Sequence, residues 1–465
     1  MTQIHNLNSI VIQFDRGTVT VEANNFTDIS KQFPWLVWDK RTGTYRCHAI
    51  YYRHLITYFH RNGLNYTDIE PKYSNLELTL STTFTPHSFQ QEAFKAWQLP
   101  KRGIAVLPTG TGKSFLAAMI MERVQRSALI IAPTIDLILQ WQKNLQDLFQ
   151  IPIGLLGGGS HEIKDITVTT YESAKIYAET IGHQFCLLIF DECHHLPSPA
   201  HSEMARAYIA PYRLGLTATP NIEPDRQLLL EELVGKELYT KDIQQLSGEF
   251  LSPYRIETIE VDLTQKEREE FEYHRKIYRD YRDKTVGSLG GQRAWERFVM
   301  YCYRTPEGRG ALKSFSIQKQ LAISAQGKFV ELAEILIRHS QERILIFTND
   351  NRTAYLISSL FLLPLITHET KARERKLILE NFRNGTWPFV VNSRVLNEGV
   401  DVPEANVAVI ISGTSTVREH VQRLGRILRR QGDKTAILYE LVTVDTGEVF
   451  ASRRRREHGA YEQFS

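Results

Sequence analysis

The stretch Gly103-Ile-Ala-Val-Leu-Pro-Thr-Gly-Thr-Gly-Lys-Ser114 decides the fold of this chain. A short apolar run leads into a loop that contains Gly110 and Gly112, and a helical pattern follows. Glycines let the backbone turn its N–H groups toward an anion, and the positive end of the next helix adds to that attraction. The stretch therefore predicts a phosphate-binding loop, although Pro108 stands where the general pattern has glycine.

This loop predicts a site for ATP and Mg²⁺. We expect Lys113 to reach the β- and γ-phosphates and the Ser114 hydroxyl to bind Mg²⁺. The rest of the loop is expected to surround the phosphates, and it consists of Thr109, Gly110, Thr111 and Gly112. A chance glycine-rich turn is the alternative, and the strand before the loop and the helix after it make that alternative improbable.

A second motif follows in Cys186-Leu-Leu-Ile-Phe-Asp-Glu-Cys-His-His195. An apolar strand ends on two adjacent carboxylates, at the sheet edge where ligands bind in parallel α/β folds. We expect Asp191 to hold Mg²⁺, directly or through water. Glu192 is expected to orient and deprotonate the water that attacks the γ-phosphate.

Two histidines follow these carboxylates and invite a metal-site interpretation. His194 and His195 lie beside Cys193, but no second Cys/His pair is near, so we expect one histidine to relay between two lobes and the other to be structural. The chain has four cysteines and no CxxC pair, which argues against a zinc ribbon, an iron–sulfur cluster or a disulfide framework.

The bulk composition is that of a soluble enzyme. The 465 residues favour about three domains, and 42% are hydrophobic and 23% charged. A net charge of +3 means that any nucleic-acid site must gather its basic residues on one surface. No stretch is apolar enough to cross a bilayer, so we expect a cytoplasmic, nucleoid-associated protein without membrane contact.

The apolar runs predict an α/β fold with two RecA-like parallel-sheet lobes in tandem. Residues 1–80 are expected to form a small α+β domain, residues 81–250 the first lobe with the ATP site, and residues 251–465 the second lobe. Within the second lobe, residues of about 263–325 are rich in Arg, Lys and Tyr and predict a helical, thumb-like insertion. The first lobe should contain strands at Gly103–Leu107, Ala128–Ala132, Cys186–Phe190 and Arg213–Leu216, and the second at Ile344–Phe347, Phe389–Asn392, Val407–Ile411 and Ala436–Leu441.

Further motifs predict coupling between the lobes. Thr217 and Thr219 follow a buried strand and are expected to sense the γ-phosphate through the Asp-Glu pair. In the second lobe, Arg426 and Arg429 share one helical face, and we expect them to act as arginine fingers on ATP bound to the first lobe. A solvated or DNA-binding basic helix is the weaker alternative. Asp401 and Gln422 complete the nucleotide site expected on this side.

Contacts with adenine and with DNA are expected from residues in loops. Phe89 and Gln90 are expected to stack on the adenine base and hydrogen-bond it. Thr134, Thr170 and Arg394 follow strands at the groove edge and are expected to bind DNA phosphates, which fixes position without reading sequence. For each of them, a plain loop residue is an equally good interpretation. The segment Tyr273–Arg282 interleaves cations with rings, which suits DNA binding, but tyrosines packed inward explain the pattern about equally well.

The ordered motifs resemble those of superfamily 2 helicases. The amino-acid sequences around these motifs are similar to those of the XPB family, particularly its short archaeal and bacterial form. The residues that carry the resemblance are Leu188-Ile-Phe-Asp-Glu-Cys-His-His-Leu-Pro197, Ile209-Ala-Pro-Tyr-Arg-Leu-Gly-Leu-Thr-Ala-Thr219 and Glu419-His-Val-Gln-Arg-Leu-Gly-Arg-Ile-Leu-Arg429. Arg41-Thr-Gly-Thr-Tyr-Arg46 matches the family's damage-recognising amino-terminal domain. The resemblance covers nearly the whole chain.

This resemblance implies an ATP-dependent DNA helicase or translocase with 3′-to-5′ polarity, active in repair or transcription. It also implies a thumb-like insertion that grips DNA and can dock a partner nuclease. Two residues depart from the family pattern: Ile222 stands where an Arg-Glu-Asp triplet has its arginine, and His87 replaces an arginine upstream of Gln90. The first change places unwinding, though not ATP hydrolysis, in question.

Two alternatives remain open at this point. An RNA helicase of the DEAD-box kind would carry Asp-Glu-Ala-Asp and Ser-Ala-Thr, where this chain has Asp-Glu-Cys-His and Thr-Ala-Thr. An ATP-gated DNA clamp that recruits other proteins is the second alternative, and Ile222 is its sequence support.

Overall fold

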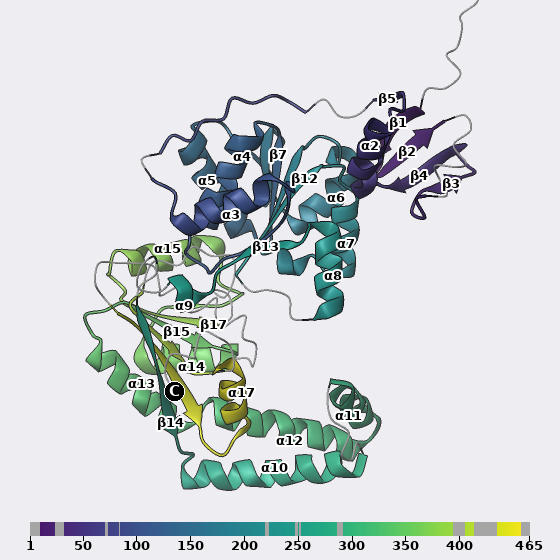
Figure 1. The fold of residues 1–465 in the computed structure, drawn as a ribbon. Coiled ribbons are helices and arrows are strands. Elements are labelled where there is room, and N and C mark those ends of the chain that lie inside the picture. Colours follow the sequence, from purple (N-terminus) through teal and green to yellow (C-terminus); the bar gives the residue numbers. More distant parts are fainter. Residues whose placement is uncertain are drawn as a thin grey trace, which may run out of the picture. The chain divides into compact units, whose positions relative to one another are not determined.

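The computed structural model describes residues 10–23, 32–69, 73–82, 84–218, 223–246, 250, 253–285, 292–393, 405–412 and 435–456. The chain divides into two compact units, Met1–Asp242 and Ile243–Ser465. Three sheets organise the described residues, two in the first unit and one in the second (Figure 1). None of the described helices is both long and apolar enough to span a bilayer.

The amino-terminal sheet has the strand order β3-β4-β2-β1-β5. Its strands are β1 (Ile10–Asp15), β2 (Thr18–Glu22), β3 (Val37–Asp39), β4 (Thr44–His48) and β5 (Tyr66–Asp68), with helix α2 (Tyr52–Arg61) after β4. The predicted half-buried strand around Val19 and Val21 is β2, and both of these side chains are fully buried. The apolar faces of this sheet and of α2 form one core.

A tight turn joins β1 to β2 and rests on the first lobe. Arg16 and Gly17 both have positive φ, 47° and 80°, the combination that matches the twist of a two-residue hairpin. A Cβ on Gly17 would lie 2.9 Å from the Cβ of Ala207. Glycine therefore serves both the turn and the close approach of the two domains.

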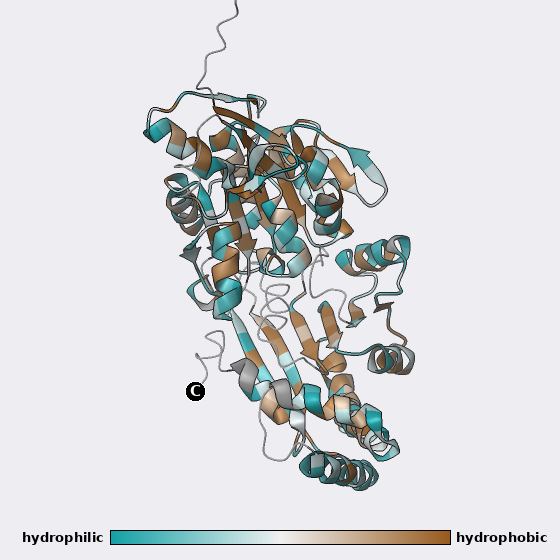
Figure 2. Cartoon of the chain, turned by 90° about the vertical axis from the view of Figure 1, so that its right-hand side faces the viewer, coloured by the Kyte–Doolittle hydropathy of each residue, from teal (hydrophilic) through white to brown (hydrophobic). Residues whose placement is uncertain are grey.

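The first lobe is built on an eight-stranded sheet with the order β13-β6-β12-β11-β7-β10-β8-β9. The strands are β6 (Arg102–Val106), β7 (Ala128–Ala132), β8 (Gly154–Gly157), β9 (Ser160–Glu162), β10 (Ile166–Thr170), β11 (Leu187–Asp191), β12 (Tyr212–Thr217) and β13 (Glu237–Thr240). All four strands predicted for this lobe are present, and all neighbouring strands except β8 and β9 pair in parallel. Figure 2 shows the hydrophobic residues concentrated in the strands.

Helices cover this sheet on both faces (Figure 1). They are α3 (Ser88–Gln98), α4 (Lys113–Val124), α5 (Ile135–Phe149), α6 (Tyr171–Ile181), α7 (Pro199–Arg206) and α8 (Pro224–Leu233), with a short 3-10 turn η2 (Cys193–His195) after β11. α5 shows why these segments are helical: Ile138, Trp141 and Leu145 recur at a spacing of three and four residues and are all buried.

The second unit contains a six-stranded parallel sheet with the order β14-β19-β18-β15-β17-β16. Its strands are β14 (Tyr254–Val261), β15 (Ile344–Thr348), β16 (Leu365–Ile366), β17 (Phe389–Ser393), β18 (Val407–Ile410) and β19 (Ala436–Thr443), and its helices are α9 (Ile243–Leu246), α13 (Gln326–Arg338), α14 (Asn351–Phe361), α15 (Ala372–Arg383) and α17 (Gly447–Arg456). The four predicted strands are confirmed. The unit begins at Ile243, slightly before the predicted lobe boundary at residue 250, because α9 belongs with it.

The predicted insertion is helical, as its lack of strand signals indicated. It consists of α10 (Gln265–Thr285), α11 (Gln292–Arg304) and α12 (Pro306–Ile323). Tyr278 and Tyr281 of α10 meet Phe298 of α11 edge-on, whereas Tyr273 is 65% exposed. Two of the three tyrosines in the Arg/Tyr-rich segment thus stabilise the insertion itself, in agreement with the structural interpretation.

A fully buried arginine ties the first lobe together. Arg213 of β12 has no exposed surface and donates to four backbone carbonyls, those of Ala205 (3.0 Å), Tyr208 (2.7 Å), Ala210 (3.4 Å) and Leu233 (2.7 Å). Ala205 lies in the last turn of α7 and Leu233 is the last residue of α8, and helix ends leave carbonyls unpaired. Burial lowers the pKa of this guanidinium well below its usual value.

We expect Arg213→Met to lower the free energy of unfolding of the first lobe by about 3 kcal/mol or more, because it leaves several buried carbonyls without donors. Urea denaturation followed by tryptophan fluorescence measures the change. Arg123→Met, on the exposed surface of α4, is the control and should change it by about 0.5 kcal/mol or less. A similarly small effect of Arg213→Met would show that Arg213 does not stabilise the lobe.

Candidate nucleotide site and nucleic-acid interface

The strand order brings the motifs of the first lobe to one edge of its sheet. β6, β12, β11, β7 and β10 are neighbours and run in parallel, so their carboxyl ends lie side by side. These ends lead in turn to the phosphate loop, Thr217, Asp191, Thr134 and Thr170. Motifs far apart in the sequence therefore meet at the edge where parallel α/β sheets bind ligands.

The phosphate loop takes the conformation that its glycines permit. Gly110 and Gly112 have φ values of 86° and 75°, which L residues rarely adopt. The hydroxyl of Thr111 donates to the carbonyl of Pro108 at 2.8 Å, and α4 starts at Lys113, with Ser114 as its second residue. The loop and the first turn of α4 form an anion-binding cradle of the expected kind.

Gln90 braces this loop from α3. Its side-chain amide donates to the carbonyls of Thr111 (3.0 Å) and Gly112 (3.3 Å), and its side-chain oxygen accepts from the backbone N–H of His87. A Cβ on Gly112 would lie only 2.7 Å from the Gln90 amide nitrogen. Gln90 therefore holds the loop in place, and the predicted hydrogen bond to adenine stays a prediction.

The expectation that Phe89 stacks on the base is wrong. The ring is 1% exposed because it belongs to the buried face of α3. The exposed ring at this position is His87, which stacks on Phe89 with ring centroids 5.5 Å apart.

Two polar groups of the loop are buried without hydrogen-bond partners among the described residues, the Thr109 hydroxyl and the Lys113 ammonium. The Lys113 nitrogen lies 3.6 Å from a carboxylate oxygen of Glu192, an ion pair but not a hydrogen bond. Buried polar groups without partners are costly in a folded protein. A cation of this kind beside a glycine loop fits a phosphate group.

Asp191 is held at three points at the end of β11. Trp141 of α5 donates its indole N–H to one carboxylate oxygen at 2.7 Å, the backbone N–H of Glu192 donates to the other at 3.1 Å, and the Tyr171 hydroxyl donates to the backbone carbonyl at 3.0 Å. Burial raises the pKa of Asp191 and the nearby Glu192 carboxylate raises it further, while Lys113 and the Trp141 N–H oppose the rise. A cation at this carboxylate would offset both unfavourable effects.

Glu192 turns the chain sharply after the strand. Its φ of 49° and ψ of 51° are left-handed, a conformation that costs a residue with a side chain about 1–3 kcal/mol. Glu192 is the N-cap of η2, so this turn starts that helix. Backbone strain at such a point is typical of functional sites.

His194 connects the Glu192 carboxylate to β12. Its Nδ1 lies 3.0 Å from the Thr217 hydroxyl and 3.4 Å from a carboxylate oxygen of Glu192, and the residue is buried. Thr217 is thus linked to Glu192 through His194. The backbone carbonyl of His195 lies 3.0 Å from Nδ1 of His201 in α7, which fits the structural part expected for one of the pair.

No group of three or more His, Cys, Asp or Glu side chains that would hold a metal by itself occurs in the described part of the chain. Mg²⁺ does not require one, since it is usually held by one or two carboxylates together with substrate phosphates and water. Asp191 and Ser114, next to the loop, are oxygen donors of the kind that it prefers. Cys193 is fully buried, and burial raises the pKa of its thiol, which disfavours the thiolate that metals bind.

The two predicted DNA-binding threonines of this lobe cap helices. Thr134 is the N-cap of α5 and accepts from the backbone N–H of Leu137, and Thr170 is the N-cap of α6 and accepts from that of Ser173. Each cap satisfies one N–H of its helix, and the helix ends remain suitable for phosphates.

Several predicted site residues lie outside the described residues. They are Thr219, Ile222, Arg394, Asp401, Gln422, Arg426 and Arg429.

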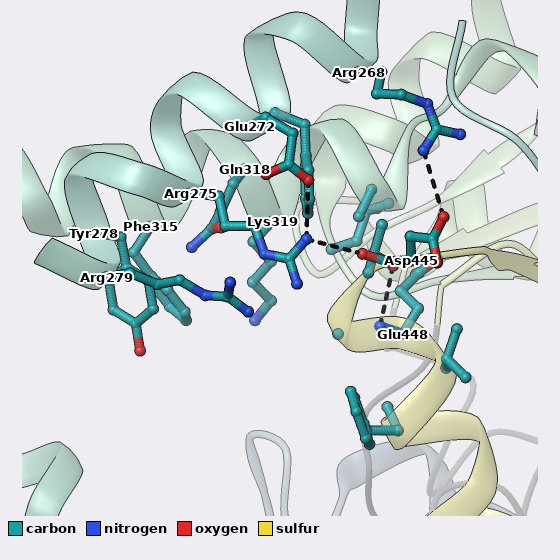
Figure 3. Close-up of a pocket in the computed structure, with 18 of the residues that line it drawn as sticks. Arg268, Glu272, Arg275, Tyr278, Arg279, Phe315, Gln318, Lys319, Asp445 and Glu448 are labelled. Carbon is teal, nitrogen blue, oxygen red and sulfur yellow. Dashed lines mark hydrogen bonds and ion pairs between the residues drawn. The ribbon is translucent and has the colours of Figure 1, made fainter. Parts of the chain in front are cut away.

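The second unit holds a basic pocket of about 980 Å³ between α10, α12 and α17 (Figure 3). Arg268 and Arg275 on its wall are paired with Asp262, Asp445 and Glu272. Arg279, Lys319 and Arg453, from three different helices, have no carboxylate partner among the described residues. The pocket therefore presents unpaired positive charge beside apolar walls.

Sequence reasoning missed Trp141 and Tyr171, which bind Asp191 from two helices. The sequence could have pointed to them, because a Trp or Tyr on the buried face of a helix needs a hydrogen-bond partner for its N–H or O–H group. The strand order, which the sequence does not give directly, decides that this partner is Asp191.

Comparisons with known proteins agree with this arrangement. Residues 12–69 match the Xeroderma pigmentosum group B helicase damage recognition domain, residues 83–222 match the Type III restriction enzyme, res subunit, and residues 301–461 match the ERCC3/RAD25/XPB C-terminal helicase. In fold, the chain is similar to the Hef helicase domain of Pyrococcus furiosus, with a TM-score of 0.55 and 22% identity over 80% of this chain and 98% of that one.

Relatives resemble the chain over most of its length. The "DNA 3'-5' translocase XPB2" of Sulfurisphaera tokodaii is 40% identical over 91% of this chain and 96% of its own length. The "DNA 3'-5' helicase XPB" of Mycobacterium tuberculosis is 28% identical over 79% of this chain, which spans 62% of that longer protein. With the amino-terminal domain, the phosphate loop and the carboxylate pair in place, the chain belongs to the XPB family of helicases.

Proposed function

We propose that this chain is a DNA-dependent ATPase that translocates on DNA with 3′-to-5′ polarity and acts in repair or transcription. The observation that carries the proposal is the meeting of Lys113 and Glu192, whose charged groups lie 3.6 Å apart at the carboxyl edge of the first-lobe sheet. The relatives named as 3′-5′ translocases and helicases of DNA supply the substrate and the polarity.

The phosphate loop binds the triphosphate of ATP. Backbone N–H groups of residues 109–112 and the ammonium of Lys113 surround the phosphates, and the first turn of α4 adds its positive end. Mg²⁺, bound between Asp191, the Ser114 hydroxyl and the phosphates, would neutralise the charge that develops on the phosphate oxygens. Gln90 keeps the loop in shape while this happens.

Glu192 is the general base of hydrolysis. Its carboxylate orients the attacking water and accepts a proton from it, while Lys113 attracts the leaving phosphate oxygens. His194 lies against Glu192 and Thr217, so a shift of either neighbour changes where the base points. We infer that this contact couples the presence of the γ-phosphate to the position of β12, through Thr217.

The second lobe supplies the arginine fingers. We assign this part to Arg426 and Arg429 because the sequence of their lobe contains no phosphate loop of its own. Arginine fingers typically speed hydrolysis by about 10³–10⁵-fold. Asp401 and Gln422 are assigned to the same side of the nucleotide.

DNA binds through helix ends in the first lobe and through the basic pocket in the second unit. The N-termini of α5 and α6 offer backbone N–H groups to phosphates. Arg279 and Lys319 of the pocket have no carboxylate partner among the described residues and are available for phosphates. Docking of a nuclease on the insertion, and a nucleoid-associated place in the cytoplasm, stay predictions.

We assign translocation, and not strand separation, as the main activity, because Ile222 replaces the arginine of the family's Arg-Glu-Asp triplet. Of the remaining acidic residues, Glu223 is exposed and ion-paired with Arg226 at 2.9 Å. A clamp with little unwinding is the second candidate, and Ile222 is the residue that favours it. Strand displacement measured together with ATP hydrolysis separates the two.

We expect Glu192→Gln to bind ATP and Mg²⁺ but to hydrolyse ATP about 10²–10⁴-fold more slowly, because the amide cannot accept the proton of the water. Lys113→Ala should lose turnover together with nucleotide affinity. Equilibrium binding of fluorescent ATP and steady-state hydrolysis measure both effects. Normal hydrolysis by Glu192→Gln would remove this residue from the role of base.

We expect Arg279→Ala and Lys319→Ala each to weaken DNA binding and to reduce the slope of log affinity against log salt by about 0.9, the value for one lost phosphate contact with duplex DNA. Fluorescence anisotropy at several salt concentrations measures the slope. Lys313→Ala is the matched control, since Lys313 is exposed on the same helix, α12, but does not line the pocket. If Arg279→Ala and Lys319→Ala showed the same slope as the control Lys313→Ala, the pocket would be excluded as a DNA contact.

A further inference from the structure

Two aromatic side chains converge on Asp191 from two different helices. The Trp141 indole, on α5, reaches the carboxylate at 2.7 Å, and the Tyr171 hydroxyl, on α6, reaches the backbone carbonyl at 3.0 Å. Both rings are buried, 4% and 2% exposed. A hydrogen bond between buried groups is stronger than one exposed to water, so each bond fixes Asp191 relative to its helix.

These two helices are the ones that begin at the expected DNA contacts. α5 follows the N-cap Thr134 and α6 follows the N-cap Thr170. Trp141 lies seven residues after Thr134, two helical turns or about 10 Å along the axis, and Tyr171 is the first residue of α6. A displacement of either helix N-terminus therefore reaches Asp191 through one rigid helix and one hydrogen bond.

We propose that Trp141 and Tyr171 are positioning residues that couple the two DNA-facing helix ends to Asp191. Trp141 sets the rotation of the carboxylate by holding one oxygen, while the Glu192 N–H holds the other. Tyr171 sets the position of the backbone at the same residue. This inference rests on the proposed function, because it assigns Asp191 to the metal and the helix ends to DNA.

The lobe offers a plain structural alternative, which is that buried rings simply need a partner for their polar atoms. Trp97 and Tyr208 show that alternative: Trp97 donates to the carbonyl of Arg213 at 2.9 Å and Tyr208 to that of Ala174 at 2.7 Å. Both are as buried as Trp141 and Tyr171, and neither bonds Asp191. They are matched controls for the loss of one buried donor.

The test compares Trp141→Phe and Tyr171→Phe with the control variants Trp97→Phe and Tyr208→Phe in the full chain. Circular dichroism melting checks that all four fold. One readout is the affinity for Mn²⁺ in the presence of a non-hydrolysable ATP analogue, followed by electron paramagnetic resonance. The second is the ratio of kcat with saturating duplex DNA to kcat without DNA, together with DNA affinity from anisotropy.

We expect Trp141→Phe to weaken Mn²⁺ binding by about tenfold or more, the usual effect of removing a hydrogen bond to a metal ligand. Both Trp141→Phe and Tyr171→Phe should reduce the stimulation by DNA about fivefold or more, with DNA affinity unchanged, because the coupling and not the binding is lost. The control variants should keep wild-type Mn²⁺ affinity and stimulation even where they melt at lower temperature.

The inference is overturned if Trp141→Phe and Tyr171→Phe behave as the controls do. If wild-type hydrolysis is not stimulated by DNA, the proposed function fails first, and the coupling fails with it. The Mn²⁺ measurement then still decides whether Trp141 positions Asp191, since it needs neither DNA nor turnover.

Discussion

The burial of the Lys113 ammonium and of the Asp191 and Glu192 side chains at one sheet edge is the constraint on which the rest of the molecule depends. Buried charges are tolerated when they are paired and hydrogen-bonded, and here the pairing is incomplete: the Lys113 ammonium has an ion pair at 3.6 Å but no hydrogen bond in the described residues. The first lobe thus carries a site whose charges are better satisfied with a phosphate and a divalent cation than without them. The strand order of its eight-stranded sheet brings the three groups together.

The surroundings of these charges are held by contacts within the first lobe itself. Gln90 hydrogen-bonds the phosphate loop, and the left-handed backbone at Glu192 sets the position of its carboxylate. The Trp141 side chain and the Glu192 backbone N–H each donate to one carboxylate oxygen of Asp191. Preorganised groups of this kind do not have to rearrange when charge develops in the reaction. The strain at Glu192 is maintained because β11 lies between two parallel neighbours and cannot relax.

Much of this could be predicted from the sequence, and the parts that could not have physical reasons. The phosphate loop and the strand before Asp191 are local patterns, so their positions were predictable to within a residue or two. Gln90 is different, because a local pattern cannot show that its amide bonds the loop instead of pointing outward. Trp141, Tyr171 and the His194–Thr217 contact depend on which strands become neighbours, and Arg213 looked like an ordinary strand residue although it is fully buried. The Arg/Tyr-rich helix α10 was ambiguous for a related reason, since helical spacing alone does not say what covers the rings.

The central claim is that the charges at this sheet edge hydrolyse ATP in response to DNA. The most direct measurement is the rate of ATP hydrolysis in Mg²⁺, titrated with single-stranded DNA, duplex DNA, a fork and RNA of matched length. We expect DNA to raise the rate many-fold and RNA to leave it near its basal value. A rate that is the same with and without DNA, or one that RNA raises as much as DNA does, would contradict the claim.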